Sequence, residues 1–152
     1  MGVKSINRIS SEDLDFIKLV ALLDADLKIR DGEEHSFYSQ FNKIDKLKNV
    51  VVCYLDGIAA GCGAFKEYDS QTVEIKRMYV LPEFRRKGIA IEVLSELETW
   101  AKDIGYSWCI LETGKKQPEA IALYQMAGYS IIPNYGQYTG KDNSVCMKKS
   151  IV

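Results

Sequence analysis

The sequence predicts a single α+β domain, residues 1–152, with a mostly antiparallel sheet at its centre. A length of 152 residues suits one domain with a core of its own. Three strand-like runs follow one another between Asn49 and Val80 and are joined by short turns, which is typical of an antiparallel meander. Helical patterns stand both before and after these runs, so helices and strands together are expected to build the core.

Composition and charge exclude several classes of protein. The formal net charge is -1, so neither nucleic acid nor a membrane surface is expected as a partner. The chain contains no signal-peptide core and no apolar run of membrane-spanning length, and a cytoplasmic protein is predicted. The four cysteines are widely spaced and are predicted to be reduced. With one histidine and no C-x-x-C pair, a zinc site would lack its usual ligands, so no metal is expected.

The first part of the chain is predicted to form one strand and two helices. Val3–Ile9 alternates as a strand, and Ser10 or Ser11 followed by two acids is a typical helix start. The charged stretch Asp24–Glu34 contains a glycine and is expected to break this helix before a second one at about Glu34–Phe41. Its acids indicate a solvated face or, as the alternative, a surface that attracts a cationic substrate.

The meander after these helices is predicted to consist of three strands, at Asn49–Leu55, Ile58–Tyr68 and Thr72–Val80. Asp56 and Gly57 separate the first two strands and favour a tight hairpin, because both residue types tolerate a positive φ. Gly61 and Gly63 lie inside the second strand and indicate either a bulge or a close approach of another backbone.

A basic loop follows the third strand. Pro82 ends that strand because it cannot donate to a ladder, and Arg85-Arg86-Lys87-Gly88 then leads into a helical pattern at 89–104. A glycine-containing basic loop at a helix N-terminus attracts anions, because unpaired N–H groups and the helix dipole both favour negative charge. A ligand that carries phosphate is therefore expected at this loop.

The last third of the chain is predicted to alternate short strands with one helix. Strands are expected at Trp108–Leu111, Tyr129–Ile132 and Ser144–Lys149. Pro118 suits the first turn of the intervening helix, and Gly128 suits its end.

The order of these elements, together with several motifs, resembles the GNAT superfamily of acetyl-coenzyme A dependent N-acetyltransferases. The signature of that family is Gln or Arg, two residues, Gly, one residue, and Gly or Ala, and Arg85, Gly88 and Ala90 match it. An A-x-x-L-Y segment at 120–124 is followed by Gly-Tyr, as in the family. The resemblance covers nearly the whole chain and is most specific at 74–129. It implies a three-layer fold, with a mixed, mostly antiparallel sheet of about seven strands and helices on both faces.

The resemblance also implies that acetyl-coenzyme A is the co-substrate. The residues implied to bind it are Arg85, Arg86, Lys87, Gly88, Ile89 and Ala90 of the loop, Met78, Tyr79 and Val80 of the strand before it, and Gln117. Loop amides would hold the pyrophosphate, and the main chain of the strand, splayed from its neighbour, would pair with the pantetheine arm. Gln117 stands where many relatives have Asn. The alternative is a basic turn that merely starts a helix.

Two residues are expected to carry the chemistry. In many relatives the tyrosine of the L-Y pair, here Tyr124, donates a proton to the departing coenzyme A thiolate; the alternative is a core aromatic residue. Glu74 stands eleven residues before Arg85, where some relatives have a glutamate that takes the proton of the amine through water. The alternative is a glutamate that faces solvent beside Lys76.

Three further residues are candidates for the acceptor pocket. Glu112 ends a strand and is expected either to orient water or a cationic substrate or to lie on the surface. Tyr135 and Tyr138 belong to a glycine-containing loop and are expected either to form a pocket wall or to cover the end of the sheet. His35, the one histidine, is given no catalytic role.

These features predict an N-acetyltransferase that moves an acetyl group from acetyl-coenzyme A to a primary amine of a small molecule or peptide in a ternary complex. The alternative is a non-catalytic domain that binds or senses acyl-coenzyme A. A polyamine, an aminoglycoside or a lysine side chain fits the acidic stretch, while a free amino acid and a protein N-terminus also stay open as acceptors. A monomer or a homodimer is expected, because the final strands offer an edge for pairing.

Overall fold

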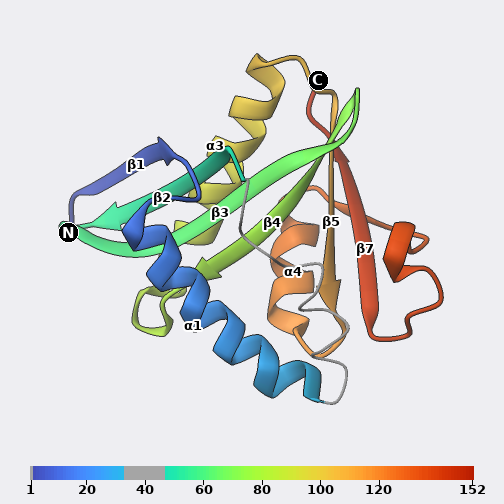
Figure 1. Cartoon of the computed structure of the whole chain (residues 1–152), viewed down its shortest axis with the longest axis horizontal. Coiled ribbons are helices and arrows are strands. Elements are labelled where there is room, and N and C mark those ends of the chain that lie inside the picture. The colour runs from blue at the N-terminus through green and yellow to red at the C-terminus, as the bar shows by residue number, and fades with distance from the viewer. Residues whose placement is uncertain (1, 33–46) are drawn as a thin grey trace.

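A seven-stranded sheet with helices on both faces forms the protein, of which the computed structural model describes residues 2–32 and 47–152 (Figure 1). The strands are β1 (Lys4–Ile9), β2 (Asn49–Leu55), β3 (Ile58–Asp69), β4 (Thr72–Val80), β5 (Trp108–Gly114), β6 (Ser130–Ile132) and β7 (Ser144–Ser150). The helices are α1 (Leu14–Asp31), α3 (Ile89–Asp103) and α4 (Pro118–Met126), with short 3₁₀ helices η2 (Pro82–Phe84) and η3 (Gly136–Tyr138).

The strand order is β1-β2-β3-β4-β5-β7-β6. Every neighbouring pair is antiparallel except β4 and β5, which run parallel. The predicted mixed, mostly antiparallel sheet of seven strands is therefore confirmed. The one parallel junction lies near the middle of the sheet, and α3 makes the crossover between its two strands.

Two hydrophobic cores lie on opposite faces of this sheet. Phe16 and Leu19 of α1 pack with Val50 and Val52 of β2 on one face. The side chains of a strand alternate between faces, so the intervening Val51 joins the core under α3 and α4 on the other face. Helix, sheet and helix thus form the three layers that were predicted, with the β4–β5 junction between them.

The start of α1 differs from its prediction. Asp13, rather than Ser10 or Ser11, caps the helix, because its carboxylate accepts a hydrogen bond from the Phe16 N–H at 3.0 Å. An aspartate in this position satisfies one of the free N–H groups and also favours the helix dipole.

The predicted end of this helix within the charged stretch 24–34 is confirmed, although α1 runs through most of the stretch, to Asp31. The charged stretch remains helical because Leu27 extends the apolar stripe toward the sheet while the charged groups form ion pairs. Gly32, with φ of 56°, follows as the C-cap. The second helix predicted at Glu34–Phe41, and His35 within it, lie outside the described residues.

The predicted glycine and turn positions are confirmed. Asp56 and Gly57 have φ of 52° and 81° and form the turn between β2 and β3. A Cβ atom on Gly61 would lie 2.8 Å from Ile89, and one on Gly63 would lie 2.9 Å from Leu97. Glycine at these two positions lets α3 pack directly on β3. The register of β3 also shifts beside Gly61 against β2 and at Gly63 against β4, so the interpretation as a bulge is confirmed as well.

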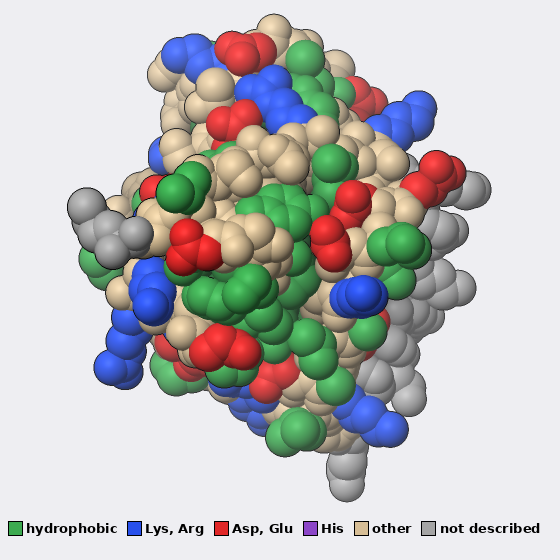
Figure 2. Space-filling model, turned by 90° about the vertical axis from the view of Figure 1, so that its left-hand side faces the viewer, with side chains coloured by type: hydrophobic (Ala, Val, Ile, Leu, Met, Phe, Trp, Pro, Cys, Tyr) green, Lys and Arg blue, Asp and Glu red, His purple; other side chains and the backbone are tan. Residues whose placement is uncertain are grey.

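Figure 2 shows the end of the molecule where the N-terminus and the β2–β3 turn lie. Hydrophobic side chains gather near the middle of this face, with acidic side chains among them (Figure 2). Val3, Leu14 and Ile58, from the elements that meet at this end, are among the exposed large hydrophobic residues. Within the described ranges, none of the helices combines the length and the apolar character that a membrane crossing requires.

Candidate active site

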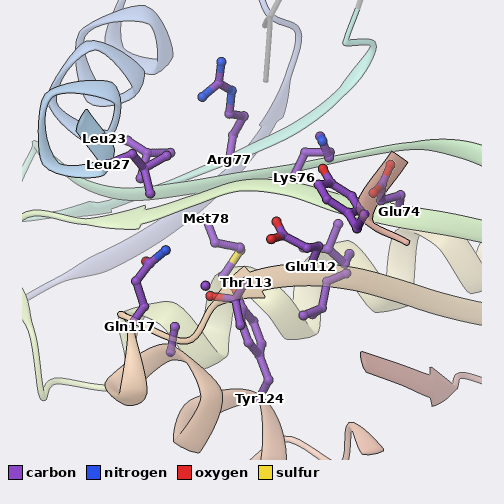
Figure 3. A pocket seen from close by; sticks show the side chains of 15 residues that line it. Leu23, Leu27, Glu74, Lys76, Arg77, Met78, Glu112, Thr113, Gln117 and Tyr124 are labelled. Atoms are coloured by element: carbon purple, nitrogen blue, oxygen red, sulfur yellow. The ribbon is translucent and has the colours of Figure 1, made fainter. Parts of the chain in front are cut away.

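β4 and β5 are hydrogen-bonded to each other at one end only. Their pairing covers 72–74 opposite 108–110, after which the two strands diverge (Figure 1). A cavity of about 110 Å³ lies where they part (Figure 3). Its walls include Glu74, Lys76, Arg77 and Met78 of β4, Glu112 and Thr113 of β5, Gln117, Tyr124 and Tyr138. Most of the predicted catalytic and acceptor residues therefore meet in one place.

A β-bulge shapes the β4 wall of this cavity. The register between β3 and β4 shifts between Cys62 and Ala64, and Arg77 on the facing strand has φ of 61°. A non-glycine residue in the left-handed region is uncommon and strained, and such strain persists only where the surrounding structure maintains it. Here the close packing of Gly63 against Met78 holds the bulge in place.

The bulge changes which face each residue of β4 points to. Ile75 before it and Met78 after it both pack in the core under α3, although three positions separate them. Two successive residues between them therefore share the opposite face. Figure 3 shows Lys76 and Arg77 on one side of the strand and Met78 on the other. The bulge thus places two adjacent cations toward the α1 side of the cavity.

Glu74 lies at the closed end of the gap and is 3% exposed. Its Oε2 accepts a hydrogen bond from the Tyr135 hydroxyl at 2.7 Å, and its Oε1 lies 3.9 Å from the Lys66 Nζ. The alternative of a solvent-facing strand glutamate does not hold, because the side chain is buried in the cavity wall. A fixed, buried carboxylate next to an open space is suited to accepting a proton.

Tyr124 rises from α4 toward the gap from the other side (Figure 3). Burial raises the pKa of its phenol, and the nearby Glu112 carboxylate raises it further. The ring also packs edge-on against Tyr129, with centroids 5.9 Å apart, and belongs to the core. The side chain therefore serves both as a core aromatic residue and as a cavity wall, with its hydroxyl protonated at neutral pH.

The three predicted acceptor residues have different positions. Glu112 and Tyr138 line the cavity, and Tyr138 is 1% exposed. Burial raises the pKa of Tyr138, and the carboxylates of Glu112 and Glu74 add to this. Tyr135 is not part of the lining; it lies behind the wall, where it holds Glu74 and packs edge-on against Tyr138 at 5.7 Å. Its expected place in the pocket wall is corrected to support of that wall.

Two charged residues of the cavity wall, Lys76 and Arg77, are not among the predicted site residues. Arg77 donates from Nη1 to Asp24 Oδ1 at 2.7 Å, which connects β4 to α1. Burial lowers the pKa of Lys76, and the Glu74 carboxylate opposes this effect. The one sequence signal for this bulge is Gly63, since a glycine inside a strand permits a bulge but does not reveal which residue of the neighbouring strand is displaced.

The basic loop has the geometry of an anion site. Arg86 and Gly88 have φ of 65° and 80°, and α3 begins at the next residue. The first N–H groups of a helix have no intrahelical acceptor and carry partial positive charge. A Cβ atom on Gly88 would meet nothing within 4 Å, so the space beside this backbone is open. The main chain of the loop is therefore suited to a phosphate group.

The side chains of the loop differ in how far they are available to bind a phosphate group. Arg85 donates from Nε to the Val80 carbonyl at 2.9 Å, and its guanidinium lies 5.5 Å from the centre of the Tyr79 ring. Part of its binding capacity is thus used to hold the loop on β4. Ile89 is 1% exposed and anchors α3 in the core, so only its main chain faces the loop. Arg86 and Lys87 are exposed cations.

Beyond Glu74, no described strand pairs with the edge of β4 that faces β5, although the Val80 carbonyl accepts the hydrogen bond from Arg85 Nε. Tyr79 and Val80 pair with β3 on their other edge, whereas the last β4–β5 pair is at Glu74. Their side chains are buried on opposite faces and fix the strand. Gln117 lines the cavity just before α4, and its carbonyl accepts the Ala120 N–H at 3.0 Å. A strand edge of this kind can form main-chain hydrogen bonds with an extended ligand arm.

Comparisons with known proteins agree with this geometry. The family model described as the acetyltransferase (GNAT) family matches residues 16–129. The chain is 37% identical over 94 residues to the uncharacterized N-acetyltransferase YsnE of Bacillus subtilis, a match that covers 60% of this chain and 62% of YsnE. This chain therefore matches less than two thirds of the length of that relative.

Solved structures show the same fold over the whole chain. A Klebsiella pneumoniae protein assigned as an acyl-CoA N-acyltransferase has a TM-score of 0.80, 29% identity and 99% coverage of both chains. A GNAT family acetyltransferase from Elizabethkingia anophelis, solved with acetyl-CoA bound, has a TM-score of 0.69, 18% identity and 97% coverage of both chains. With the diverging strands, the loop and the family match together, the chain belongs to the GNAT acetyltransferase family.

Proposed function

We propose that this protein is an N-acetyltransferase that moves the acetyl group of acetyl-coenzyme A directly to a primary amine of a small molecule or peptide. One observation carries the proposal: the cavity between β4 and β5 has the buried carboxylate of Glu74 in one wall and the buried phenol of Tyr124 in another. In the transfer, the amine nitrogen bonds to the carbonyl carbon of the thioester and the C–S bond breaks. No covalent acyl-enzyme is involved.

The reaction needs a group that removes a proton from the amine. An amine with a pKa of about 10.4 is mostly protonated at pH 7, which corresponds to a free-energy disadvantage of roughly 4.6 kcal/mol. Glu74 takes up this proton, and the Tyr135 hydroxyl at 2.7 Å fixes the orientation of its carboxylate. The cation of Lys76 in the same wall disfavours a second positive charge and so favours the neutral, nucleophilic form of the amine.

The reaction also needs a proton for the sulfur that leaves. Tyr124 retains its proton at neutral pH, because burial raises the pKa of its phenol. The developing thiolate takes this proton, which makes coenzyme A the better leaving group. The phenol and the carboxylate thus have opposite tasks at the two sides of one cavity.

Acetyl-coenzyme A fits the residues next to the cavity. The open backbone at Gly88, the N-terminus of α3 and the exposed Arg86 and Lys87 suit its phosphates. The β5-facing edge of β4 suits its pantetheine arm, which would bring the thioester to Met78 in the cavity wall. Support comes from the Elizabethkingia anophelis protein of the same fold, whose structure holds acetyl-CoA.

The test is release of coenzyme A thiol from acetyl-coenzyme A in the presence of a panel of primary amines. The cysteines of the protein do not disturb such an assay, because burial raises the pKa of Cys62 and Cys109 to about 12 and that of Cys146 to about 11, and Cys53 is buried as well. Amine-dependent thiol release supports the proposal. Calorimetric binding of acetyl-coenzyme A without turnover of any amine would instead indicate a domain that senses acyl-coenzyme A.

A further inference from the structure

The α1 side of the cavity contains both signs of charge. Lys76 and Arg77, which the bulge places side by side, are 9% and 8% exposed. Glu74 and Glu112 face the same cavity from β4 and β5. Two buried cations thus stand among the carboxylates of this site, whereas a pocket for a polycation would be expected to have acids without cations between them.

Two acids of α1 are themselves paired with cations. Asp24 is paired with Arg77 at 2.7 Å, and Asp26 is paired with Arg30 at 3.2 Å. The sequence predicts the charged stretch 24–34 as one possible surface for a cationic substrate. In the described part of this stretch, Asp24 and Asp26 are instead engaged in ion pairs. Within that part, therefore, neither Asp24 nor Asp26 is left unpaired for a polyamine or an aminoglycoside.

Arg77 has binding capacity that its protein partners leave unused. Its Nη1 donates to Asp24, while its Nε is buried and has no hydrogen-bond partner in the described structure. The residue also has φ of 61°, a strained conformation for an arginine. Because the guanidinium presents its N–H groups as a rigid fork, it is suited to a planar carboxylate.

We infer that the acceptor of this enzyme is an amino acid, whose carboxylate pairs with Arg77 while its amine lies toward Glu74 and Glu112 in the gap between β4 and β5. The inference rests on the proposed acetyl transfer. The amine nitrogen forms a bond to the acetyl carbonyl carbon and loses its proton to a wall carboxylate. The C–S bond breaks and the sulfur takes the Tyr124 proton, and the proton held by the carboxylate then restores the phenol of Tyr124. The products are an N-acetyl amino acid and coenzyme A.

The test compares three kinds of acceptor with the unmodified protein in the thiol-release assay. The panel contains L-amino acids such as alanine, glutamate, methionine and phenylalanine, their α-amides, and the corresponding decarboxylated amines, with spermidine as a polyamine. For the best amino acid, kcat/KM is expected to exceed that of its amide and its decarboxylated amine by about 10- to 100-fold, which is the usual contribution of a charge-assisted hydrogen-bonded pair.

The second arm removes the cation. Arg77→Asn suits the backbone, because asparagine tolerates a positive φ, and Arg77→Lys keeps the charge without the fork. Both variants are expected to raise KM for the amino acid by at least about 10-fold, with little change in KM for acetyl-coenzyme A and little change for the amide. Lys28→Gln removes an exposed cation of α1 outside the cavity and is expected to leave every parameter unchanged.

The outcomes distinguish a wrong acceptor from a wrong reaction. If kcat/KM for the amides or for spermidine equals that for the amino acids, the inference is overturned and the proposed acetyl transfer stands. An amino-acid preference that survives in a folded Arg77→Asn protein also overturns the inference. Release of no thiol from any member of the panel overturns the inference together with the acetyl transfer.

Discussion

The two sides of the cavity are built from different parts of the chain. Toward the loop, binding groups belong to the main chain: the N-terminus of α3, the open backbone at Gly88 and the β5-facing edge of β4. Toward α1, the surroundings are set by buried side chains, namely those of Glu74, Lys76 and Arg77. The loop side therefore depends on backbone conformation, and the α1 side depends on the chemistry of individual residues.

Because of this difference, substitutions on the two sides are expected to have separate effects on the kinetic parameters of the two substrates. Changes on the loop side are expected to affect the parameters for acetyl-coenzyme A, and changes on the α1 side those for the acceptor. Tyr124 stands at the junction, where it would act on the sulfur without holding either substrate. Four substitutions test the separation, and the largest effect is expected at this junction.

Tyr124→Phe is expected to lower kcat by about 100-fold or more, because a positioned general acid contributes about 10² to 10⁴. The ring is kept, so packing against Tyr129 and the KM for acetyl-coenzyme A should change little. Steady-state kinetics with both substrates varied measure this. The matched control is Tyr129→Phe, a neighbouring buried tyrosine that donates to Glu98 at 2.8 Å instead of facing the cavity. Unaltered turnover in Tyr124→Phe would remove the phenol from the mechanism.

Glu74→Gln is expected to lower kcat/KM for the acceptor by about 100-fold while leaving acetyl-coenzyme A binding intact. The amide of the variant keeps the shape of the side chain but cannot accept the proton of the amine, so the chemical step should slow while the cofactor still binds. Steady-state kinetics with the acceptor varied and calorimetry with acetyl-coenzyme A measure the two effects. If Glu112→Gln lowers kcat/KM for the acceptor by about 100-fold and Glu74→Gln does not, the proton acceptor is the carboxylate on β5.

Tyr135→Phe tests support of the base rather than the base itself. It removes the 2.7 Å hydrogen bond to Glu74, and a hydrogen bond to a charged group contributes about 1.5–3 kcal/mol. We expect kcat/KM for the acceptor to fall by about 10-fold, with little change in KM for acetyl-coenzyme A. Tyr68→Phe is the control, since the Tyr68 ring packs on Tyr135 at 5.3 Å and is not among the residues that line the cavity. Equal kcat/KM values in Tyr135→Phe and Tyr68→Phe would assign Tyr135 to packing alone.

The loop side and the sheet could be predicted because their signals are local in the sequence. The Asp56-Gly57 turn, the glycines of β3 and the Arg85–Ala90 motif each determine backbone conformation within a few residues. The divergence of β4 and β5 was implied by the family resemblance, and the structure confirms it. The same resemblance implies that Gln117 lies at the cofactor site, and Gln117 does line the cavity.

The α1 side could not be predicted to the same extent, because it depends on contacts between distant residues. The bulge at Arg77 arises from pairing with β3 and from the packing around Gly63, so alternation along β4 alone assigns the wrong face to the residues after the bulge. The charged stretch predicts that α1 ends within it but not how far the helix runs into it, since Asp24 is helical and pairs with Arg77. Both features depend on interactions between residues far apart in the sequence, such as Asp24 and Arg77, which are separated by 53 positions.

Gly88→Ala is expected to have the smallest effect and gives the sharpest comparison, because the chain contains a matched glycine. Gly88 and Gly57 have φ of 80° and 81°, and a Cβ atom on either would meet nothing within 4 Å. Alanine in this conformation costs roughly 1 kcal/mol at both sites, so Gly88→Ala and Gly57→Ala should lower thermal stability similarly. Only Gly88→Ala should also raise KM for acetyl-coenzyme A, by about fivefold, since its loop would have to leave the binding conformation to relieve the strain. Equal KM values in the two variants would show that the positive φ at Gly88 starts a helix and does nothing for the ligand.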